Sequence, residues 1–282
     1  MPSALKYDLL AIDLDGTLLD SAHALPSANR AALHRAHDAG IRIVLCTGRA
    51  FTETRPVLDQ IGLDLDAAVT VFGALVTEVE SGRTLYRTAL PLDVARAVTD
   101  WFQRDGYAVL WLADADEVGF DGYLVAGPNR HAAVDTWLSL SPCQVREVQR
   151  IPADAAAPVR VSIIDDAAAL EAVSRRLRAD FDGRLTHNVL HAPPYRLSLI
   201  EAFAPQVSKW YGIEKLCRRW AIDPRRTVAV GDDINDLQML EHAGLGVAMG
   251  NAGPAVQAVA DRVIGTNDAC GVAELIGELL AE

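Results

Sequence analysis

The chain has 282 residues, enough to bury a sizeable core in one large domain or two ordinary ones, and we expect two. Half of its residues are hydrophobic and 23% are charged, the balance of a folded globular protein rather than a disordered or fibrous one. The formal net charge of −12 argues against nucleic acid or an anionic membrane as a partner, because this surface would repel both polyanions. A small anionic substrate stays compatible, since a local cation can reverse the sign of one pocket.

The N-terminal sequence and the cysteines both favour a cytoplasmic protein. The segment MPSALKYDLLAIDLDGT lacks the long apolar stretch and the small-residue cleavage site of a signal peptide. No apolar run approaches the ~20 residues needed to span a bilayer. The cysteines are widely spaced, without a CxxC pair or a Cys/His cluster of zinc-ligand spacing, and we expect buried thiols in a reducing compartment. They are Cys46, Cys143, Cys217 and Cys270.

The first predicted element is a buried strand over 9–12. Its sequence LLAI is a continuous apolar run that stops at Asp13, as in a parallel strand buried on both faces. A helix is expected over about 26–39, with Ser27 as a possible N-cap and Gly40 as its stop. The carboxylates that follow the strand therefore lie at its C-terminal end.

The next elements continue an alternation of strands and helices. A second buried strand over 41–46 leads into Thr47-Gly48-Arg49 at the equivalent strand end. A helix is expected near 55–61, closed by Gly62, and a third strand near 67–71. Parallel sheets built in this way place their ligands at the carboxyl ends of the strands.

The middle of the chain has a different pattern. From Leu75 onward the sequence predicts a hairpin around Ser81-Gly82. Alternating helix-like and strand-like stretches follow it near 92–105, 107–112, 128–138, 159–164 and 166–180. This region shows no recognisable cluster of catalytic side chains.

The buried-strand pattern returns near 195–200. A helix follows, with Lys209 at its start and apolar residues at helical spacing, namely Ile213, Leu216, Cys217 and Trp220. A further strand over 227–230 runs directly into the acidic segment 231–236. The simplest organisation is a sheet domain formed by both ends of the chain, 1–85 and 190–282, with a second domain inserted at 86–189.

The segment Asp13-Leu14-Asp15-Gly16-Thr17 places two carboxylates two residues apart. Gly16 lets the chain bend so that Asp13 and Asp15 can face one ligand, and backbone N–H groups of such a turn can face an anion. Taken alone, the pattern is explained equally well by a strand-end turn or a helix cap. It is neither an EF-hand loop nor a Walker A loop, because the third alternate ligand and the GxxxxGK[ST] pattern are missing.

A second acidic group contains Asp232, Asp233 and Asp236. Taken alone, it is explained by favourable opposition to the positive end of a helix macrodipole. If it converges with Asp13 and Asp15, however, each like-charged pair at ~4 Å costs about 4 kcal/mol at an effective dielectric of about 20. A bound cation relieves this repulsion. Oxygen ligands without His or Cys select Mg²⁺, which commonly uses carboxylates, waters and a substrate phosphate.

Three further groups can bind a phosphate. Thr47 can supply a hydroxyl, the backbone of Gly48 an N–H, and Lys209 a compact positive charge. Taken singly, a threonine at a strand end is usually structural and a lone lysine is usually a solvated surface charge. Together with the carboxylates, these groups supply the positioning and charge neutralisation that phosphoryl transfer needs.

At these residues the chain resembles the haloacid dehalogenase superfamily, and within it the Cof-type sugar-phosphate phosphatases that carry an α/β cap of the C2B kind. Four motifs appear in order: DLDGT at 13–17, CTGR at 46–49, VSK at 207–209 and GDDINDLQML at 231–240. The resemblance covers most of 8–74 and 197–276. It implies an α/β fold class, a Rossmann-like parallel sheet core with an inserted, mobile α/β cap domain that selects the substrate.

The resemblance also implies roles for individual residues. Asp13 is the nucleophile that becomes an aspartyl phosphate, and Asp15 is the general acid/base. Thr47 and Lys209 bind the phosphate, and Asp232 binds magnesium with Asp13 and the Asp15 carbonyl. Asn235 and Asp236 match supporting positions around the phosphate and the metal. The implied reaction is Mg²⁺-dependent hydrolysis of a small phosphorylated metabolite.

The chain departs from the family pattern at three positions. Phe72-Gly73-Ala74 stands where relatives often have Asn-Gly-Ala, so a side-chain contact to substrate is expected to be missing there. Gln206 and Trp210 flank the VSK motif where glycines are common. These departures concern the substrate and the local shape rather than the phosphoryl chemistry.

Three alternatives stay open on sequence grounds. A phosphomutase related to the eukaryotic phosphomannomutases would use the same nucleophile and cap type. A receiver-type signalling module also surrounds a phosphoaspartate with acidic residues, a threonine and a lysine, but it needs neither Asp15 nor a ~100-residue insertion. A catalytically silent binding protein is disfavoured because all recognisable catalytic positions are filled. The sequence specifies neither the leaving group nor the oligomeric state.

Overall fold

The computed structural model describes residues 6–192 and 197–281, which form two compact units. The first unit is built from both ends of the chain, up to Tyr86 and again from Ser208. The second unit is the intervening segment Arg87–Val207. An inserted second unit agrees with the organisation expected from the sequence, but the chain returns to the first unit at Ser208 and not at 190.

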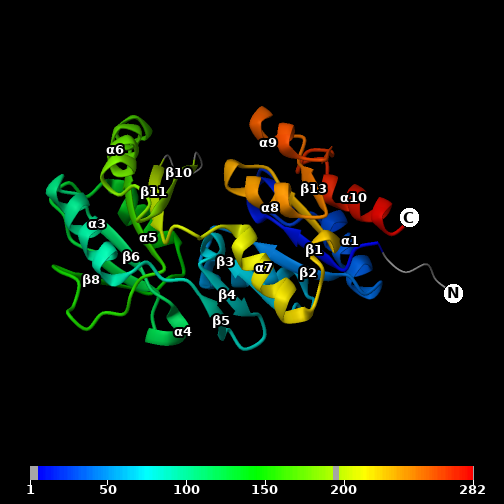
Figure 1. Cartoon of the computed structure of the whole chain (residues 1–282), viewed down its shortest axis with the longest axis horizontal. Helices are drawn as coiled ribbons and strands as arrows, with labels where there is room; N and C mark the ends of the chain where they lie inside the picture. The colour runs from blue at the N-terminus through cyan, green and yellow to red at the C-terminus, as the bar shows by residue number, and fades with distance from the viewer. Residues whose placement is uncertain (1–5, 193–196, 282) are drawn as a thin grey trace. The chain divides into compact units, whose positions relative to one another are not determined.

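An eight-stranded sheet forms the centre of the first unit (Figure 1). In spatial order its strands are β14 (Arg262–Val263), β13 (Leu245–Ala248), β12 (Thr227–Gly231), β1 (Leu9–Ile12), β2 (Arg42–Cys46), β3 (Ala67–Thr70), β4 (Leu75–Glu78) and β5 (Thr84–Arg87). The strands from β14 to β3 are parallel, and β4 is antiparallel to β3. The parallel strands place their carboxyl ends at one edge of the sheet, where ligands bind in folds of this kind.

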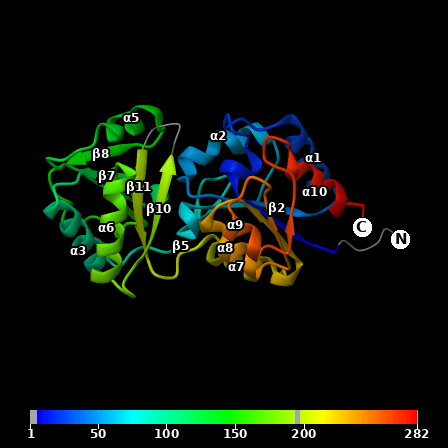
Figure 2. The ribbon, with the colours of Figure 1, turned by 90° about the horizontal axis from the view of Figure 1, so that it is seen from above.

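Helices cover both faces of this sheet (Figure 2). One face packs against α1 (Ser27–Asp38), α2 (Phe51–Ile61) and α10 (Gly271–Leu279). The other packs against α7 (Lys209–Trp220), α8 (Leu237–His242) and α9 (Pro254–Val259). In β1, Leu10 and Ile12 belong to the first core and Leu9 and Ala11 to the second, which explains the continuous apolar run.

Two predicted helix starts differ from the structure. Helix α1 begins at Ser27, and Pro26 is its N-cap, so Ser27 is a helical residue and not a cap. Helix α2 begins at Phe51 rather than near Arg55, so Pro56 lies inside the helix and not in its first turn. The predicted helix ends are confirmed. Gly40 and Gly62 follow the two helices with φ values of 95° and 68°, a left-handed conformation that ends a helix and that glycine adopts at little cost.

A six-stranded, mainly antiparallel sheet forms the second unit. Its strands, in spatial order, are β10 (Thr186–Ala192), β11 (Leu197–Phe203), β9 (Arg160–Asp165), β6 (Val109–Leu112), β7 (Gly122–Val125) and β8 (Val145–Val148). Its helices are α3 (Leu92–Arg104), α4 (Ala115–Val118), α5 (Ala132–Leu140) and α6 (Ala167–Asp180). Helix α5 packs on the face that carries Leu124 and Ile164, and α3 and α6 lie on the opposite side of the sheet (Figure 2).

The strand expected near 195–200 belongs to the second sheet, which corrects the expected core segment beginning at 190. Strand β11 pairs antiparallel with both β10 and β9, with Ile200 opposite Val189 on one side and Ile163 on the other. Tyr195 and Arg196, where that strand was expected to begin, lie outside the described residues. The physical reason for the error is that alternating apolar residues indicate a buried strand without specifying its sheet.

The cytoplasmic location expected from the sequence rested on buried thiols and on the lack of a membrane-spanning segment. All four cysteines are free; Cys46 and Cys217 are buried, whereas Cys143 and Cys270 are only half-buried, so the expectation of four buried thiols holds for two. Within 6–192 and 197–281, no helix is both long enough and apolar enough to cross a bilayer. The cytoplasmic location stays a prediction.

Candidate active site

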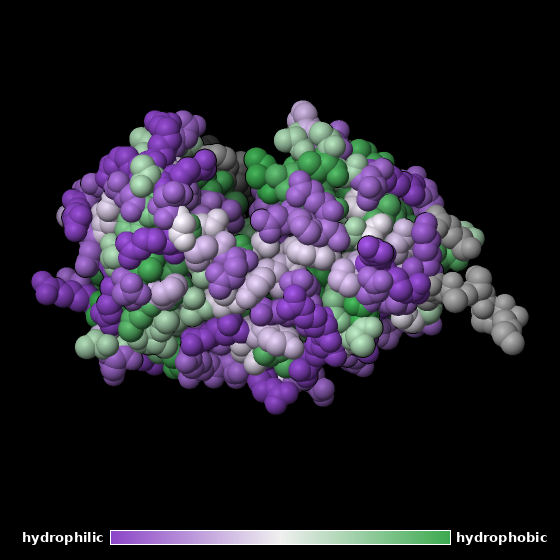
Figure 3. All heavy atoms as spheres, in the orientation of Figure 1, coloured by the Kyte–Doolittle hydropathy of each residue, from purple (hydrophilic) through white to green (hydrophobic). Residues whose placement is uncertain are grey.

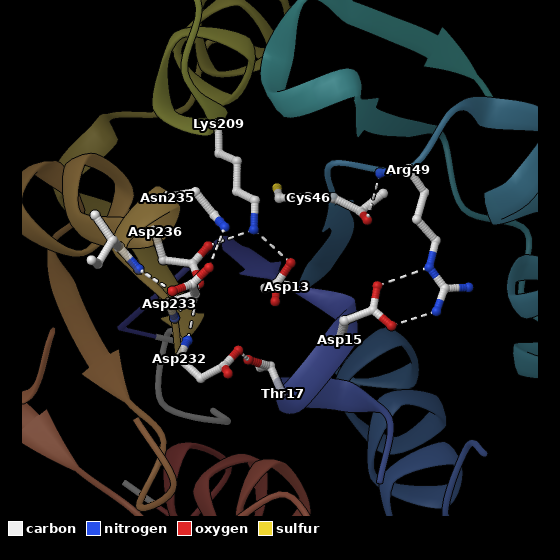
Figure 4. A network of polar contacts seen from close by, with 12 residues as sticks. Asp13, Asp15, Thr17, Cys46, Arg49, Lys209, Asp232, Asp233, Asn235 and Asp236 are labelled. Atoms are coloured by element: carbon white, nitrogen blue, oxygen red, sulfur yellow. Dashed lines mark hydrogen bonds and ion pairs between the residues drawn. The ribbon is translucent and has the colours of Figure 1, made fainter. Parts of the chain in front are cut away.

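Residues from both ends of the chain meet at the carboxyl edge of the parallel sheet. Asp13 follows β1, Thr47 follows β2 and Asp232 follows β12. The backbone continues the sheet pairing at these positions, because Asp13 N donates to Val230 O at 3.0 Å and Thr47 N donates to Val69 O at 2.9 Å. Figure 4 shows the side chains that converge on Asp13.

A buried ammonium lies between two carboxylates at the centre of this group. Lys209 Nζ donates to Asp13 Oδ1 at 2.5 Å and to Asp236 Oδ1 at 2.6 Å, and the lysine side chain is only 2% exposed (Figure 4). Burial alone would lower the pKa of Lys209, but the charges of Asp13 and Asp236 raise it above its ordinary value. Lys209 therefore stays protonated, and the alternative explanation of Lys209 as a solvated surface charge is excluded.

The acidic loop after β12 is organised by Asp236. Its Oδ2 accepts hydrogen bonds from the backbone N–H groups of Asp232 and Asp233, both at 3.0 Å. A Cβ at Gly231 would lie 2.4 Å from Asp236 Cγ, so only glycine fits at the end of the strand. Asp236 thus ties the loop to Lys209 through its two oxygens.

Asp13, Asp232 and Asp236 form a group of oxygen ligands suited to a cation. One carboxylate oxygen from each lies within 4.8 Å of the others. Burial raises the pKa of Asp13, Lys209 opposes that shift, and the charges of Asp236 and Asp232 add to it. Burial and the neighbouring Asp236 raise the pKa of Asp232 to about 6. The carboxylates of Asp13, Asp232 and Asp236 therefore disfavour one another's ionisation, and a divalent cation would offset this.

The DLDGT turn fits closely around Asp232. Thr17 Oγ1 donates to Asp232 Oδ1 at 2.8 Å. Gly16 has φ 80°, and a Cβ there would lie 2.3 Å from Asp232 Oδ2, so both its backbone conformation and its missing side chain are needed. Sequence reasoning did not assign a role to Thr17, although it is the last residue of the motif.

Asp15 turns away from this centre toward Arg49 (Figure 4). Arg49 Nε donates to Asp15 Oδ2 at 2.8 Å and Arg49 Nη2 donates to Asp15 Oδ1, while His23 Nδ1 lies 3.2 Å from Oδ1. Burial would raise the pKa of Asp15, but the hydrogen bonds and charge of Arg49, with His23, lower it. Arg49 belongs to the CTGR motif and its role could have been sought there, whereas no sequence signal indicated His23.

The remaining candidates surround the same strand ends. Thr47 is buried, and its Oγ1 accepts a hydrogen bond from Arg49 N at 3.1 Å. Gly48 packs under the ring of Phe72, since a Cβ at position 48 would lie 2.2 Å from the ring atom Cζ. Asn235 Nδ2 donates to Asp233 Oδ2 at 2.9 Å and so borders the acidic loop.

Three asparagines that the sequence did not single out hold the turn after Asp13. Their side-chain amides donate to three backbone carbonyls of this turn: Asn251 to Gly16 at 2.8 Å, Asn29 to Leu18 at 2.9 Å and Asn267 to Leu19 at 3.0 Å. Asn267 N in turn donates to Asn251 Oδ1 at 3.0 Å. Helix α1 and the C-terminal segment therefore support the turn after Asp13 through side-chain amides, and no local sequence pattern indicates this role.

The edge of the acidic loop carries hydrophobic surface. Ile234, between Asp233 and Asn235, is 68% exposed, and its segment Ile234–Asp236 contacts α9. On the face seen in Figure 3, hydrophobic side chains of the first unit gather around α9. The carboxylates are therefore bordered by apolar groups on this side.

The second unit contains another group of three potential ligands, His131, Asp165 and Asp166. His131 Nδ1 accepts a hydrogen bond from Ala133 N at 3.1 Å at the start of α5, which places the ring proton on Nε2. That nitrogen lies 3.6 Å from Asp166 Oδ1. The nitrogen that faces the carboxylates therefore carries the proton in this tautomer, and these contacts describe a helix cap beside two carboxylates rather than a metal site.

Comparison with known proteins identifies the family of this chain. The sequence profile of haloacid dehalogenase-like hydrolases matches residues 10–276. The chain belongs to this family. The family predicted from the sequence motifs is therefore confirmed. The predicted α/β fold is also confirmed, with a mainly parallel core sheet and a second sheet.

Relatives of this haloacid dehalogenase-like hydrolase resemble it along nearly all of the chain. The putative phosphatase YxeH of Bacillus subtilis is 30% identical over 280 residues, with 97% of this chain and 98% of that protein covered. The HMP-PP phosphatase of Cronobacter sakazakii is 30% identical over 250 residues, with 86% and 84% covered. The crystal structure of a haloacid dehalogenase-like hydrolase from Bacteroides thetaiotaomicron has a TM-score of 0.80 at 29% identity, with 97% and 99% covered.

Proposed function

We propose that this hydrolase is a phosphatase of small phosphorylated metabolites and that Asp13 is its nucleophile. The observation that carries the proposal is the buried contact of 2.5 Å between Asp13 and Lys209, flanked by Asp232 and Asp236. A carboxylate attacking a phosphate dianion needs a nearby cation, because both reactants are anionic. Relatives named as phosphatases over nearly the whole chain support the same reaction.

The proposed reaction has two half-reactions. An oxygen of Asp13 bonds to phosphorus as the bond from phosphorus to the leaving oxygen breaks, and Asp15 gives that oxygen a proton. Water then attacks the phosphorus of the aspartyl phosphate as the bond from phosphorus to the Asp13 oxygen breaks. Asp15 takes the water proton, which it gives to the next leaving oxygen, and inorganic phosphate is released as Asp13 is restored. Arg49 and His23, which hold Asp15, keep its carboxylate ready for the second step.

The phosphate ligands in this proposal come from three elements. The hydroxyl of Thr47 and the N–H of Gly48 follow β2, Lys209 begins α7, and Asn235 lies in the loop after β12. Their donors would face the phosphoryl oxygens on which negative charge is spread in the transition state. The second unit, Arg87–Val207, would act as the cap that selects the leaving group.

Magnesium is the proposed metal. The donors of Asp13, Asp232 and Asp236, with the main-chain carbonyl of Asp15, are all oxygens, which fits a hard cation better than zinc or copper. Asp236 already binds Lys209 and two backbone N–H groups, so it would support the site while Asp13 and Asp232 supply the carboxylate ligands. When bound, magnesium supplies positive charge that stabilises the phosphate oxygens.

Sugar phosphates or related compounds are the proposed substrates. One relative is named for HMP-PP, which is also a small phosphorylated compound. The exposed Ile234 beside the acidic loop suits a substrate with a partly apolar leaving group. A phosphomutase would have to return the phosphoryl group to a sugar and exclude water, and no described residue demands that outcome.

A phosphate-release screen tests the function. Sugar phosphates, nucleotides and phosphorylated cofactors would be assayed with Mg²⁺ and again after exhaustive chelation with EDTA. We expect Mg²⁺-dependent release of inorganic phosphate from several sugar phosphates, and poor support by Ca²⁺ because its looser coordination displaces the nucleophile. Isomerised sugar phosphate without free phosphate would establish a mutase instead. Full activity in EDTA would contradict the metal-dependent mechanism.

A further inference from the structure

The turn Val71–Gly73 follows β3 in an unfavourable backbone conformation. Val71 and Phe72 have φ values of 50° and 55°, and Gly73 has 94°. Left-handed φ values are uncommon for residues other than glycine and are true outliers for a β-branched or bulky residue. Such strain persists only where the surroundings enforce it, and it clusters at functional sites.

One side of this turn is bound to the phosphate-binding strand end. Val71 N donates to Arg49 O and Phe72 N donates to Thr47 O, both at 3.0 Å. The Phe72 ring, only 5% exposed, covers Gly48, where a Cβ would lie 2.2 Å from ring atom Cζ. The turn therefore holds Thr47, Gly48 and Arg49 through two hydrogen bonds and one ring.

The other side of the turn meets the start of α7. A Cβ at Gly73 would lie 2.0 Å from Ser208 O, and the Ser208 side chain caps α7 by accepting a hydrogen bond from Tyr211 N. Lys209 Nζ lies 5.9 Å from the centre of the Phe72 ring, near the outer limit of a cation–π contact. One short turn thus touches both the Thr47 loop and the residue before Lys209.

We propose that Phe72 is a positioning residue that sets the spacing between the phosphate donors of Thr47 and Gly48 and the ammonium of Lys209. The inference rests on the proposed phosphatase function of the same site. The strained backbone lets the ring fill the space between Gly48 and Lys209, where water would otherwise weaken the charge interactions of the lysine. Phe72 acts through these neighbours and is not itself a catalytic residue.

The proposal predicts that Phe72→Gly loses more phosphate binding than its lower stability explains. Glycine adopts the left-handed conformation without strain. The loss of a buried ring outweighs this relief, so the melting temperature should fall. Because no side chain then fills the space between Gly48 and Lys209, we expect a kcat at least tenfold lower and a Kd for inorganic phosphate at least tenfold higher in Mg²⁺.

Two further variants separate positioning from general packing. Ile276→Ala is the matched control, because Ile276 on α10 is also buried and lies outside the site. It should lower the melting temperature and leave kcat and phosphate Kd unchanged. Phe72→Leu keeps an apolar side chain and should give values of kcat and phosphate Kd between those of the unaltered protein and Phe72→Gly.

Para-nitrophenyl phosphate turnover and calorimetric binding of inorganic phosphate would be measured for all four proteins well below their melting temperatures. Weaker phosphate binding in folded Phe72→Gly than in folded Ile276→Ala supports the inference, even if the unaltered protein hydrolyses no phosphate ester and the proposed function fails. Values of kcat and Kd for Phe72→Gly within twofold of the unaltered protein would overturn it. Equal losses of phosphate binding in Ile276→Ala and Phe72→Gly would also overturn it and leave a packing role.

Discussion

Buried charges occur in both units but in different structural settings. In the first unit, Lys209, Asp13 and Asp236 lie where strands and a helix end or begin, and they come from segments far apart in the chain. In the second unit, Arg160 and Glu201 lie within neighbouring antiparallel strands, 2.5 Å apart and 9% and 2% exposed. The first set opens onto loops that can bind a ligand, whereas the second is enclosed by regular sheet.

This difference indicates which charges perform chemistry and which hold a fold. Groups at the carboxyl ends of parallel strands lie in loops that can approach a ligand. A pair within two paired strands is fixed by the sheet, and breaking it leaves one buried charge uncompensated. Substitutions in the first unit should therefore reduce turnover, and substitutions in the second should reduce stability.

The largest effect is expected for Asp13→Asn. It removes the nucleophile, so turnover with every substrate should fall by at least about 10⁴-fold, because no aspartyl phosphate can form. Phosphate release at saturating substrate measures it. Asp59→Asn, an exposed change on α2, is the control and should retain full activity. Turnover by Asp13→Asn within tenfold of the unaltered enzyme would contradict the assignment.

Asp15→Asn should separate proton transfer from bond formation. Loss of a positioned general acid typically reduces the rate by ~10²–10⁴-fold for an alkyl sugar phosphate. An aryl phosphate needs that proton far less, so para-nitrophenyl phosphate should still phosphorylate Asp13. Rapid-quench measurements should show one burst of nitrophenol and a lingering, hydroxylamine-sensitive phosphoenzyme. Equal losses on both substrates without a trapped intermediate would make Asp15 a structural residue.

Lys209→Met should reduce phosphate release by about 10²–10³-fold, the usual result of removing one charge-stabilising donor. Asp13 and Asp236 lose the cation between them. Phosphate release by the variant and by the unaltered enzyme should therefore be compared in Mg²⁺, which offsets the repulsion between the two carboxylates. Lys215→Met on the same helix is the control, because Lys215 contacts the rings of Tyr86 and Tyr211 rather than a carboxylate. Near-native turnover with a native melting curve would remove Lys209 from the chemistry.

Glu201→Gln tests the second unit. It removes the carboxylate paired with the buried charge of Arg160, and the free energy of unfolding should fall by about 3 kcal/mol. Glu214→Gln, which breaks the exposed pair with Arg218 on α7, should cost less than about 1 kcal/mol. Denaturant unfolding of the full chain measures both, and kcat on para-nitrophenyl phosphate should stay within threefold. A large fall in kcat at unchanged stability would place Glu201 among the reacting groups.

The smallest effect is expected in the pH dependence of stabilisation by Mg²⁺. The pKa of Asp232 is raised from 3.8 to about 6, so its contribution to metal-free stability is present below pH ~4 and is lost as the pH rises through about 6. The metal needs the ionised form, so stabilisation by Mg²⁺ should grow over the same range. Tenfold weaker binding one pH unit below the pKa amounts to about 1.4 kcal/mol.

Thermal melts with and without Mg²⁺ at pH 5 and pH 7.5 would show this growth as a larger metal-dependent rise in melting temperature at the higher pH. Asp232→Asn is the control and should abolish most of the difference. Equal rises at both pH values in the unaltered protein would contradict the role of Asp232 as a metal ligand.

Sequence patterns predicted the first unit better than the second. Strands β1, β2, β3 and β12 appeared as continuous apolar runs ending in polar motifs, because strands buried on both faces have no polar side. Short strands β7 and β8 and helix α4 were not predicted, since four-residue elements carry little periodic signal.

Trp210 departs from the family pattern, and the centre of its ring lies 5.7 Å from the centre of the His242 ring.

The sequence by itself determined the candidate chemistry, because carboxylates, a threonine and a lysine occur in ordered motifs at predicted strand and helix ends. Only the tertiary structure decided how these groups pair: Lys209 between Asp13 and Asp236, Arg49 on Asp15, and the asparagine amides on the turn after Asp13. It also decided that β11 joins the second sheet. The reason is that hydrogen bonds and ion pairs depend on distances between segments remote in the chain, whereas periodicity reports only which residues are buried.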